Sequence, residues 1–405
     1  MIFSLLDRAL ISFVNLVYGL VLIKYETTDG YAYYSLVFAS MMLVGGIGNS
    51  IVSTPLTVYM YDKRLEEQDN FVLQHIVMGA VMLLVFSLLA LFLILTANYL
   101  FIFEVHRFVF IGLAASSLYS LFEIVRKTIM AEMRHKMLFI LDVAQSAVGA
   151  LVVCIGLICY EYQLFELVLL GFCVSYAFMT VVFLFVKYGN KLLSGIYGLS
   201  FRDLTGLWIR GCWGLLGMSV TWAGNQGFLY LALVLVNREF VAMLNASKLI
   251  VSPLQTLYSS MASFYLPKIA KIAKPKGKAK IELLNFLGIN MLFLLVYTIF
   301  VVISYDLIKQ KILESYNVDA ILIAWFVHSF FISLRIVGSI GLQAEREFKR
   351  LAFAMMISTG IGLSVSAILT SFAGSTGFMF GLVCTEILAM TIVWGNLNGI
   401  WRKVG

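Results

Sequence analysis

Charged side chains are scarce in this sequence. They make up 13% of its 405 residues, whereas 61% are hydrophobic and the mean hydropathy is +0.95. Soluble domains carry roughly 25% charged residues and about 45–50% apolar ones. No stretch beyond about twenty residues is polar enough to form a domain outside a bilayer. The composition therefore predicts a polytopic membrane protein in which nearly every residue lies in lipid.

Cysteine and histidine are also few. The five cysteines lie in apolar runs without metal-ligand spacing or paired loop positions, so they are interpreted as small core side chains. The four histidines are isolated or near loops, and no nucleophile or metal constellation emerges. The segment KGKAK lacks the Gly-x-x-x-x-Gly-Lys-Ser/Thr pattern that wraps phosphates. We therefore expect no enzyme activity, no metal and no cofactor, with coupling to an H⁺ or Na⁺ gradient left open.

Long apolar runs are what the sequence has in abundance. A helix needs roughly twenty residues to cross about 30 Å of hydrocarbon, and twelve such spans can be drawn. An outer-membrane barrel would instead show alternating segments of about ten residues, so an all-α fold is expected. The expected spans are 5–23, 33–61, 71–97, 108–130, 137–159, 166–186, 211–236, 241–266, 281–303, 318–342, 350–370 and 376–399.

Lysine and arginine are distributed unevenly between the loops. With the N-terminus in the cytoplasm, 22 of the 29 lie on the inner side and five on the outer side. Six lysines fall within 268–280, interpreted as a cytoplasmic loop facing anionic headgroups. Nucleic acid is not an expected partner, since this run lacks aromatics and no separate basic domain exists to carry it. The charge asymmetry predicts a multi-pass protein with both termini cytoplasmic.

The most polar connector divides the chain into halves. LVLI at 20–23 ends a helix, and the next helix closes at Pro55; LVLV at 233–236 and Pro267 repeat this order. Because each half has six helices and enters from the cytoplasm, a parallel repeat is expected. The expected organisation is an N-terminal six-helix lobe at 1–186, a cytoplasmic linker at 187–210 and a C-terminal six-helix lobe at 211–405.

Two stretches resemble a known family. WAGNQGFLYLALVLVNREFVAMLNASKLIVSPLQTLYSSMASFYLP at 222–267 is similar to the seventh and eighth helices of bacterial polysaccharide and O-antigen flippases of the multidrug/oligosaccharidyl-lipid/polysaccharide exporter superfamily. The start, 5–36, resembles that family's first two helices, although KYETTDG lacks the expected Leu-Gly opening.

The resemblance implies two six-helix lobes around a central cavity that opens alternately to each face. It also implies a location in the bacterial inner membrane and export of a polyprenyl-diphosphate-linked oligosaccharide for cell-surface polysaccharide biosynthesis. The implied partners are this lipid-linked substrate, membrane lipids and other polysaccharide assembly proteins.

Charges inside the spans are the candidate substrate contacts. Each costs at least about 2.5–3.5 kcal/mol at mid-membrane unless it meets water or a partner. Lys248 and Arg335, with Arg8 near the cytoplasmic entrance, are expected to contact phosphate. The alternatives are snorkelling for Lys248 and Arg335, and an ion pair or headgroup contact for Arg8. Glu386 is either a packing residue or a candidate for ion coupling.

Uncharged polar residues extend this set. Asn15, Asn225, Gln226 and Asn245 fall in the first, seventh and eighth helices, which line the cavity in the family. They are expected to face sugars, and interhelical hydrogen bonding is the alternative. Elsewhere, Glu123 and Arg126 are expected to pair with each other on one helix face, and Asp142 to be structural.

Two other function classes compete with a flippase. A polymerase or acyltransferase of glycan assembly should present a sizeable outer loop or a catalytic cluster, and the sequence has neither. An ion-coupled exporter of drugs or small metabolites on the same twelve-helix plan would use buried carboxylates, for which Glu386 and Asp142 are available. Embedded cations favour the flippase, because they suit a substrate that carries phosphate charge.

Overall fold

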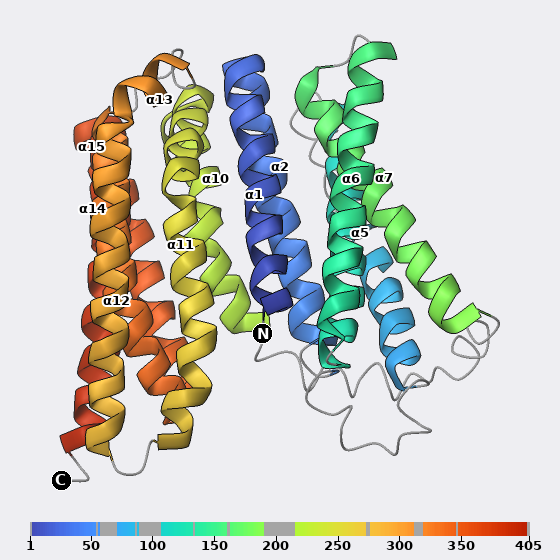
Figure 1. Ribbon diagram of the computed structural model, residues 1–405. Coiled ribbons are helices and arrows are strands. Elements are labelled where there is room, and N and C mark those ends of the chain that lie inside the picture. Colours follow the sequence, from blue (N-terminus) through green and yellow to red (C-terminus); the bar gives the residue numbers. More distant parts are fainter. Residues whose placement is uncertain are drawn as a thin grey trace. The chain divides into compact units, whose positions relative to one another are not determined.

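The protein is described by a computed structural model over most of its length. The described residues are 2–53, 56, 71–85, 87–88, 107–132, 134–159, 163–189, 215–272, 276–311, 319–345 and 347–402. Over these ranges the chain is helical and forms no strand (Figure 1). Seven of the described helices are long and apolar enough to cross a membrane. The expected all-α, polytopic membrane fold is confirmed, and the count of twelve crossings stays a prediction because several spans lie partly outside these ranges.

The helices fall into two series along the chain. The first comprises α1 (Ile2–Tyr25), α2 (Thr28–Gly48), the π-helix η1 (Asn49–Ser53), a helix at 71–85, α5 (Arg107–Ala131), α6 (His135–Cys159) and α7 (Leu164–Tyr188). The second comprises a helix at 215–222, the π-helix η4 (Ala223–Gly227), α10 (Phe228–Leu235), α11 (Arg238–Ile272), α12 (Lys276–Ile303), α13 (Tyr305–Lys311), α14 (Asp319–Ala344) and α15 (Phe348–Arg402).

These helices gather into two compact units that are not continuous in sequence. The first unit contains Met1–Val14 and Tyr33–Trp222, and the second contains Asn15–Ala32 and Ala223–Gly405. The C-terminal part of α1 and the start of α2 therefore pack with the second half of the chain. The lobe limits expected from the sequence follow the linker at 187–210, most of which lies outside the described residues, and they stay a prediction.

The first unit is built around α5, α6 and α7, which contact one another. The ring of Tyr176 on α7 lies 5.5 Å from Tyr119 and 5.3 Å from Phe122, both on α5. Between α6 and α7, a Cβ added at Gly171 would stand 3.0 Å from the carbonyl oxygen of Gly149. Small residues let helix backbones approach closely in lipid, where van der Waals packing replaces the hydrophobic drive. Tight packing here holds the polar side chains of α5 and α6 against each other.

The second unit contains a helical hairpin within α15. Gly374 has φ 56° and ψ −136°, a backbone conformation that favours glycine, and it separates two helical stretches. The two predicted spans 350–370 and 376–399 are thus confirmed as two helices. A Cβ at Gly377 would lie 2.1 Å from the carbonyl oxygen of Leu369, and one at Gly381 would lie 2.3 Å from Cα of Ser366. The two arms pack backbone to backbone through this Gly-x-x-x-Gly pair.

Side chains cap two of the helices at their N-termini. Thr27 Oγ1 accepts a hydrogen bond from the Gly30 amide at 3.0 Å, and Asn237 Oδ1 accepts one from the Phe240 amide at 2.8 Å. Both side chains therefore cap the helix that follows a short turn. Pro253 lies within α11, and the helix continues through it.

The lysine run is more helical than expected. The loop is shorter than the predicted range 268–280, because α11 continues to Ile272 and α12 begins at Lys276. Lys, Ala and Ile are reasonable helix formers, so nothing in the run stops α11 early, and Pro275 directly precedes the first residue of α12. Lys268 reaches Glu282 at 2.7 Å, which joins the two helix ends.

Candidate functional site

Lys248 lies on α11, near the middle of the candidate span Arg238–Ser259. Its ammonium donates to the backbone carbonyl of Asn225 and, at 3.3 Å, to Oε1 of Gln226. Both acceptors belong to η4. A π-helical turn carries an extra residue and breaks the regular i to i−4 ladder, so a carbonyl there can accept an outside donor. The segment AGNQG thereby supplies two oxygens to one cation inside the membrane span.

Two aromatic rings complete the surroundings of Lys248. Its Nζ lies 4.9 Å from the ring centroid of Phe228 on α10 and 5.8 Å from that of Trp325 on α14. Trp325 is almost fully buried, and its Nε1 donates to the Leu244 carbonyl at 3.2 Å. A cation over an aromatic face gains about 0.5–2 kcal/mol. The rings and the amide oxygens hold Lys248 in place from three helical elements.

The charge of Lys248 is not neutralised by these contacts. Its hydrogen bonds go to two amide oxygens, and across the described parts of the chain it forms no ion pair with a carboxylate. Amide oxygens and aromatic rings stabilise a cation without removing its net charge, so a positive potential remains around Nζ. A buried unpaired charge is expensive, which makes it a candidate for binding an anion.

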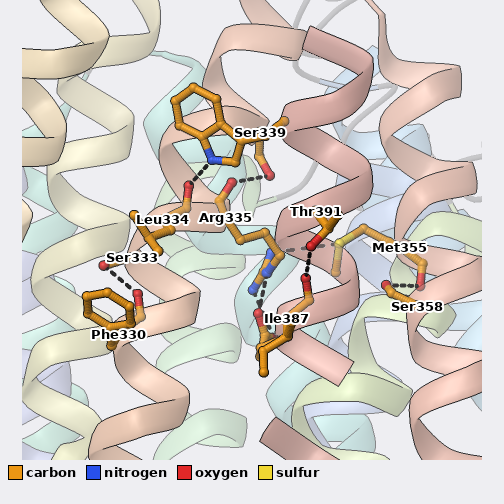
Figure 2. A network of polar contacts seen from close by, with 11 residues as sticks. Phe330, Ser333, Leu334, Arg335, Ser339, Met355, Ser358, Ile387 and Thr391 are labelled. Atoms are coloured by element: carbon orange, nitrogen blue, oxygen red, sulfur yellow. Dashed lines mark hydrogen bonds and ion pairs between the residues drawn. The ribbon is translucent and has the colours of Figure 1, made fainter. Parts of the chain in front are cut away.

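Arg335 is placed differently. It lies on α14 among polar contacts contributed by α14 and α15 (Figure 2). Its Nε donates to Glu386 Oε2 at 2.6 Å and its Nη2 to Glu386 Oε1 at 3.4 Å, and Nη1 reaches the Met355 sulfur at 3.8 Å. Exposure of the side chains is 13% for Arg335 and 6% for Glu386. Arg335 and Glu386, expected to act separately on phosphate and on a coupling ion, therefore form one buried, bidentate ion pair.

His328 lies near both cations, Lys248 and Arg335, although the sequence shows it only as an isolated histidine. Its ring meets that of Trp325 edge to face at 5.0 Å, and it lies within electrostatic range of Lys248, Arg335 and Glu386. The side chain is buried, and Nδ1 has no hydrogen-bond partner among the described residues. The spacing of 325, 328 and 335 on one face of a helix was the signal that could have found it.

The remaining expected site residues scatter. Asn245 donates to the Tyr31 hydroxyl at 3.2 Å, which ties α11 to α2 and matches the interhelical alternative. Asn15 is half-buried in α1. Arg8 falls in α1, but its side chain lies outside the described residues. The structure thus brings together Lys248, Asn225 and Gln226 from the expected set.

The chemistry available at Lys248 is that of anion recognition. Three N–H donors on a flexible stem suit a phosphate oxygen, and the exposed Asn225 side chain adds amide groups of both hydrogen-bonding types. No group of three or more His, Cys, Asp or Glu residues suited to a metal ion occurs within the described ranges.

Comparison with known proteins places this geometry in a fold. No protein-family model and no curated protein sequence matches the chain. Solved structures do. A multidrug resistance MATE family transporter of the MOP superfamily, in an inward-facing conformation, superposes with a TM-score of 0.76 at 14% identity, over 98% of this chain and 96% of that chain. The chain has the fold of MOP superfamily transporters.

Two further structures show how varied that fold is in function. The lipid II flippase MurJ matches with a TM-score of 0.73 at 15% identity, over 98% of this chain and 87% of that chain. A MOP superfamily transporter from Pyrococcus furiosus matches with a TM-score of 0.68 at 13% identity, covering 100% of this chain and 93% of that one. Its description reports a binding pocket of reversed polarity that suggests a different function. A shared fold does not carry a shared substrate, so the substrate must be argued from the site.

Proposed function

We propose that this chain is a membrane transporter that moves a polyprenyl-diphosphate-linked oligosaccharide from the cytoplasmic to the outer leaflet by alternating access. Under this proposal it serves cell-surface polysaccharide biosynthesis in a bacterial inner membrane, with both termini in the cytoplasm. The observation that carries the proposal is Lys248, whose charge stays unneutralised within a membrane span. The MOP fold supports it, because that fold hosts both a lipid II flippase and drug exporters.

The argument from charge is direct. A diphosphate must pass a region of low dielectric, where an unpaired anion is costly and a fixed cation lowers that cost. Lys248 provides such a cation, and a hydrogen bond to a charged group contributes about 1.5–3 kcal/mol. The neighbouring amides of Asn225 and Gln226 then suit the hydroxyl groups of the first sugars. Arg335 is assigned a supporting part, because Glu386 already takes two of its donors.

The rival function is an ion-coupled exporter of drugs or small metabolites. It is favoured by the presence of multidrug transporters among the similar structures. Such an exporter of organic cations needs a carboxylate that a cation can reach. Glu386 is buried and paired with Arg335, so its charge is already neutralised. The balance of charge at this site therefore favours an anionic substrate.

The test is a flux assay in proteoliposomes with a fluorescent polyprenyl-diphosphate disaccharide. The transported fraction is the label that becomes accessible to a membrane-impermeant quencher. Lys248→Gln should lower the rate about tenfold or more, since losing about 1.4 kcal/mol of charged contact corresponds to one factor of ten. Lys248→Arg should retain most of the rate because it keeps the charge.

Two controls make the result specific. Lys309→Gln removes an exposed cation on α13 that pairs with Asp319 at 2.8 Å, and it should leave the rate unchanged. A neutral glycolipid with the same sugars should be insensitive to Lys248→Gln. If Lys248→Gln transported the diphosphate probe at the wild-type rate, while Glu386→Gln lost efflux of a cationic dye, the exporter would replace the flippase.

A further inference from the structure

His328 is a buried polar side chain to which the proposed function gives no part. It lies on α14, and its ring packs edge to face against the indole of Trp325 at 5.0 Å. Its Nδ1 is enclosed by protein atoms and has no hydrogen-bond partner among the described residues, whereas its Nε2 is not enclosed in this way. Most buried polar groups in proteins are hydrogen-bonded. An imidazole left without this bond inside a membrane span is therefore a candidate for contact with a ligand.

A histidine in the first unit shows the purely structural arrangement. His75, on the helix at 71–85, is also buried, and its Nδ1 lies 2.8 Å from the carbonyl oxygen of Phe71 one turn earlier. A bond of this kind fixes the ring and its tautomer without any ligand. Nδ1 of His328 has no such bond within the described ranges. Packing against Trp325 positions its ring instead, so a hydrogen bond to the ring remains available to a ligand.

His328 and Lys248 lie against the same indole. The Lys248 Nζ is 5.8 Å from the centroid of the Trp325 ring, and the imidazole centroid is 5.0 Å from the indole. The ammonium and the imidazole are therefore separated by no more than the sum of these distances, and they interact electrostatically. Lys248 comes from α11 and His328 from α14, two helices that contact each other. A ligand with two linked acceptor groups can reach both.

The other charged groups near His328 are paired with each other. Arg335 on α14 and Glu386 on α15 both act on His328 electrostatically, and two hydrogen bonds join them. Lys248 is the cation near His328 that has no carboxylate partner in the part of the chain that the structure describes. An anion held at Lys248 would therefore meet His328 as the next available donor.

We propose that His328 is the second contact for the anion, so that Lys248 holds one phosphate of a diphosphate and the Nε2–H of His328 donates to the other. Because Nδ1 is enclosed, the ring proton lies on Nε2, where an acceptor can reach it. Each hydrogen bond spans only about 2.7–3.2 Å, so two linked phosphates reach both donors and a single phosphate reaches one. His328 thereby makes the site select a diphosphate over a monophosphate. The lipid-linked origin of that diphosphate rests on the proposed function.

Binding of prenyl phosphates to the full chain in lipid nanodiscs tests this selection. By isothermal titration calorimetry, the wild type should bind farnesyl diphosphate more tightly than farnesyl monophosphate. His328→Leu should lower the diphosphate affinity about tenfold, as expected for one lost hydrogen bond to a charged group, and leave the monophosphate affinity unchanged. His328→Gln should keep most of the affinity, because its amide N–H lies near the position of Nε2. His75→Leu, at the structural histidine, should leave both affinities unchanged.

Nitrogen NMR gives a readout in the wild type itself, so it does not depend on how well a variant folds. The chain has four histidines, and the Nε2 signal of His328 is the one that His328→Gln lacks. Farnesyl diphosphate should shift that signal, since a hydrogen bond forms at Nε2, and farnesyl monophosphate should shift it little. If the diphosphate binds without shifting the His328 signal, or if both prenyl phosphates bind equally well, the second contact is overturned and Lys248 keeps its part.

Two further measurements separate the His328 contact from the proposed function. Inorganic pyrophosphate should bind the wild type more weakly than farnesyl diphosphate, because it lacks the prenyl chain. Equal binding of the two, with the same loss in His328→Leu, would assign the site to a soluble diphosphate and overturn the lipid-linked substrate. Diphosphate selection that depends on His328, without any flux of the disaccharide probe, would overturn transport and leave the two-point site standing. A wild type that binds none of these ligands would overturn both.

Discussion

The cations among the helices of the two units are held by different partners. In the first unit, two carboxylates meet one arginine at Arg126. In the second, one carboxylate meets one arginine at Arg335, and Lys248 stands on amide oxygens and aromatic rings. In the part of the chain that the structure describes, both arginines pair with carboxylates, whereas Lys248 forms no ion pair with a carboxylate. The difference teaches that a cation among packed helices can be held by carboxylates, which cancel its charge, or by neutral groups, which do not.

The largest effect is expected from breaking the balanced pair. Glu386→Leu leaves the Arg335 guanidinium buried and unpaired, and it should lower the free energy of unfolding by about 3–5 kcal/mol. Unfolding in mixed micelles with increasing denaturing detergent measures this. Arg335→Leu combined with Glu386→Leu should recover most of the loss, because an apolar pair carries no desolvation cost. A double variant as unstable as the single one would contradict the neutral-pair interpretation.

A smaller loss is expected when the hairpin that carries Glu386 is forced apart. Gly377→Ala places a Cβ against the Leu369 carbonyl, and overpacking of this kind costs about 1–3 kcal/mol. Gly399→Ala is the matched control in the same element, since a Cβ there meets nothing within 4 Å. The same detergent titration should show a shift for the first variant and little for the second. Equal shifts would remove the hairpin from the account of how Glu386 is positioned.

The aromatic support of Lys248 should contribute less. Trp325→Phe keeps a ring near the ammonium and removes the Nε1 donor to the Leu244 carbonyl, which should cost about 1 kcal/mol of stability. Trp394→Phe is the comparison, because its Nε1 donates to the Leu334 carbonyl at 2.9 Å, away from Lys248. Both variants should lose similar stability, yet flux of the diphosphate probe should fall further for Trp325→Phe. Equal flux in the two would separate Trp325 from the anion site.

The smallest effect belongs to the exposed charges. The Glu282 carboxylate hydrogen-bonds Lys268 and raises the pKa of that ammonium above its ordinary value of 10.5. A raised pKa in the folded state means that the stabilisation is complete below the unfolded value and is lost as the pH rises through the folded one. Glu282→Gln should therefore change the thermal midpoint only slightly at neutral pH, and the difference from wild type should vanish in strong alkali. A large difference that persisted there would require another cause.

Local sequence patterns predicted the elements well. The separation between Glu123 and Arg126 is three residues, which a helix turns into contact on one face, and the pair is confirmed. The two spans on either side of Gly374 are confirmed as helices for a similar reason, since length and hydropathy are local properties. The prediction of a loop over 268–280 was wrong in its extent. It followed the charge density of the run, whereas the helix propensity of its residues extends α11 and α12 into it.

Contacts between distant residues could not be read in this way. Arg335 and Glu386 are 51 residues apart, and Asn245 and Tyr31 are 214 residues apart, so no periodicity links them. The sequence alone treated Lys248 and Arg335 as equivalent embedded cations. Their difference depends on which side chains the packing of α11, α14, α15 and η4 brings within hydrogen-bonding distance.

Composition by itself determined that this chain lives in a membrane as helices, because a backbone in hydrocarbon must satisfy its own hydrogen bonds. It also determined which residues would be costly there. Tertiary structure alone decided which partners each cation has. Arg335 pairs with one carboxylate and Arg126 contacts two, whereas Lys248 has no carboxylate partner among the described residues. The physical reason is that an ionic interaction depends on distances of a few ångströms between helices, which no single helix specifies.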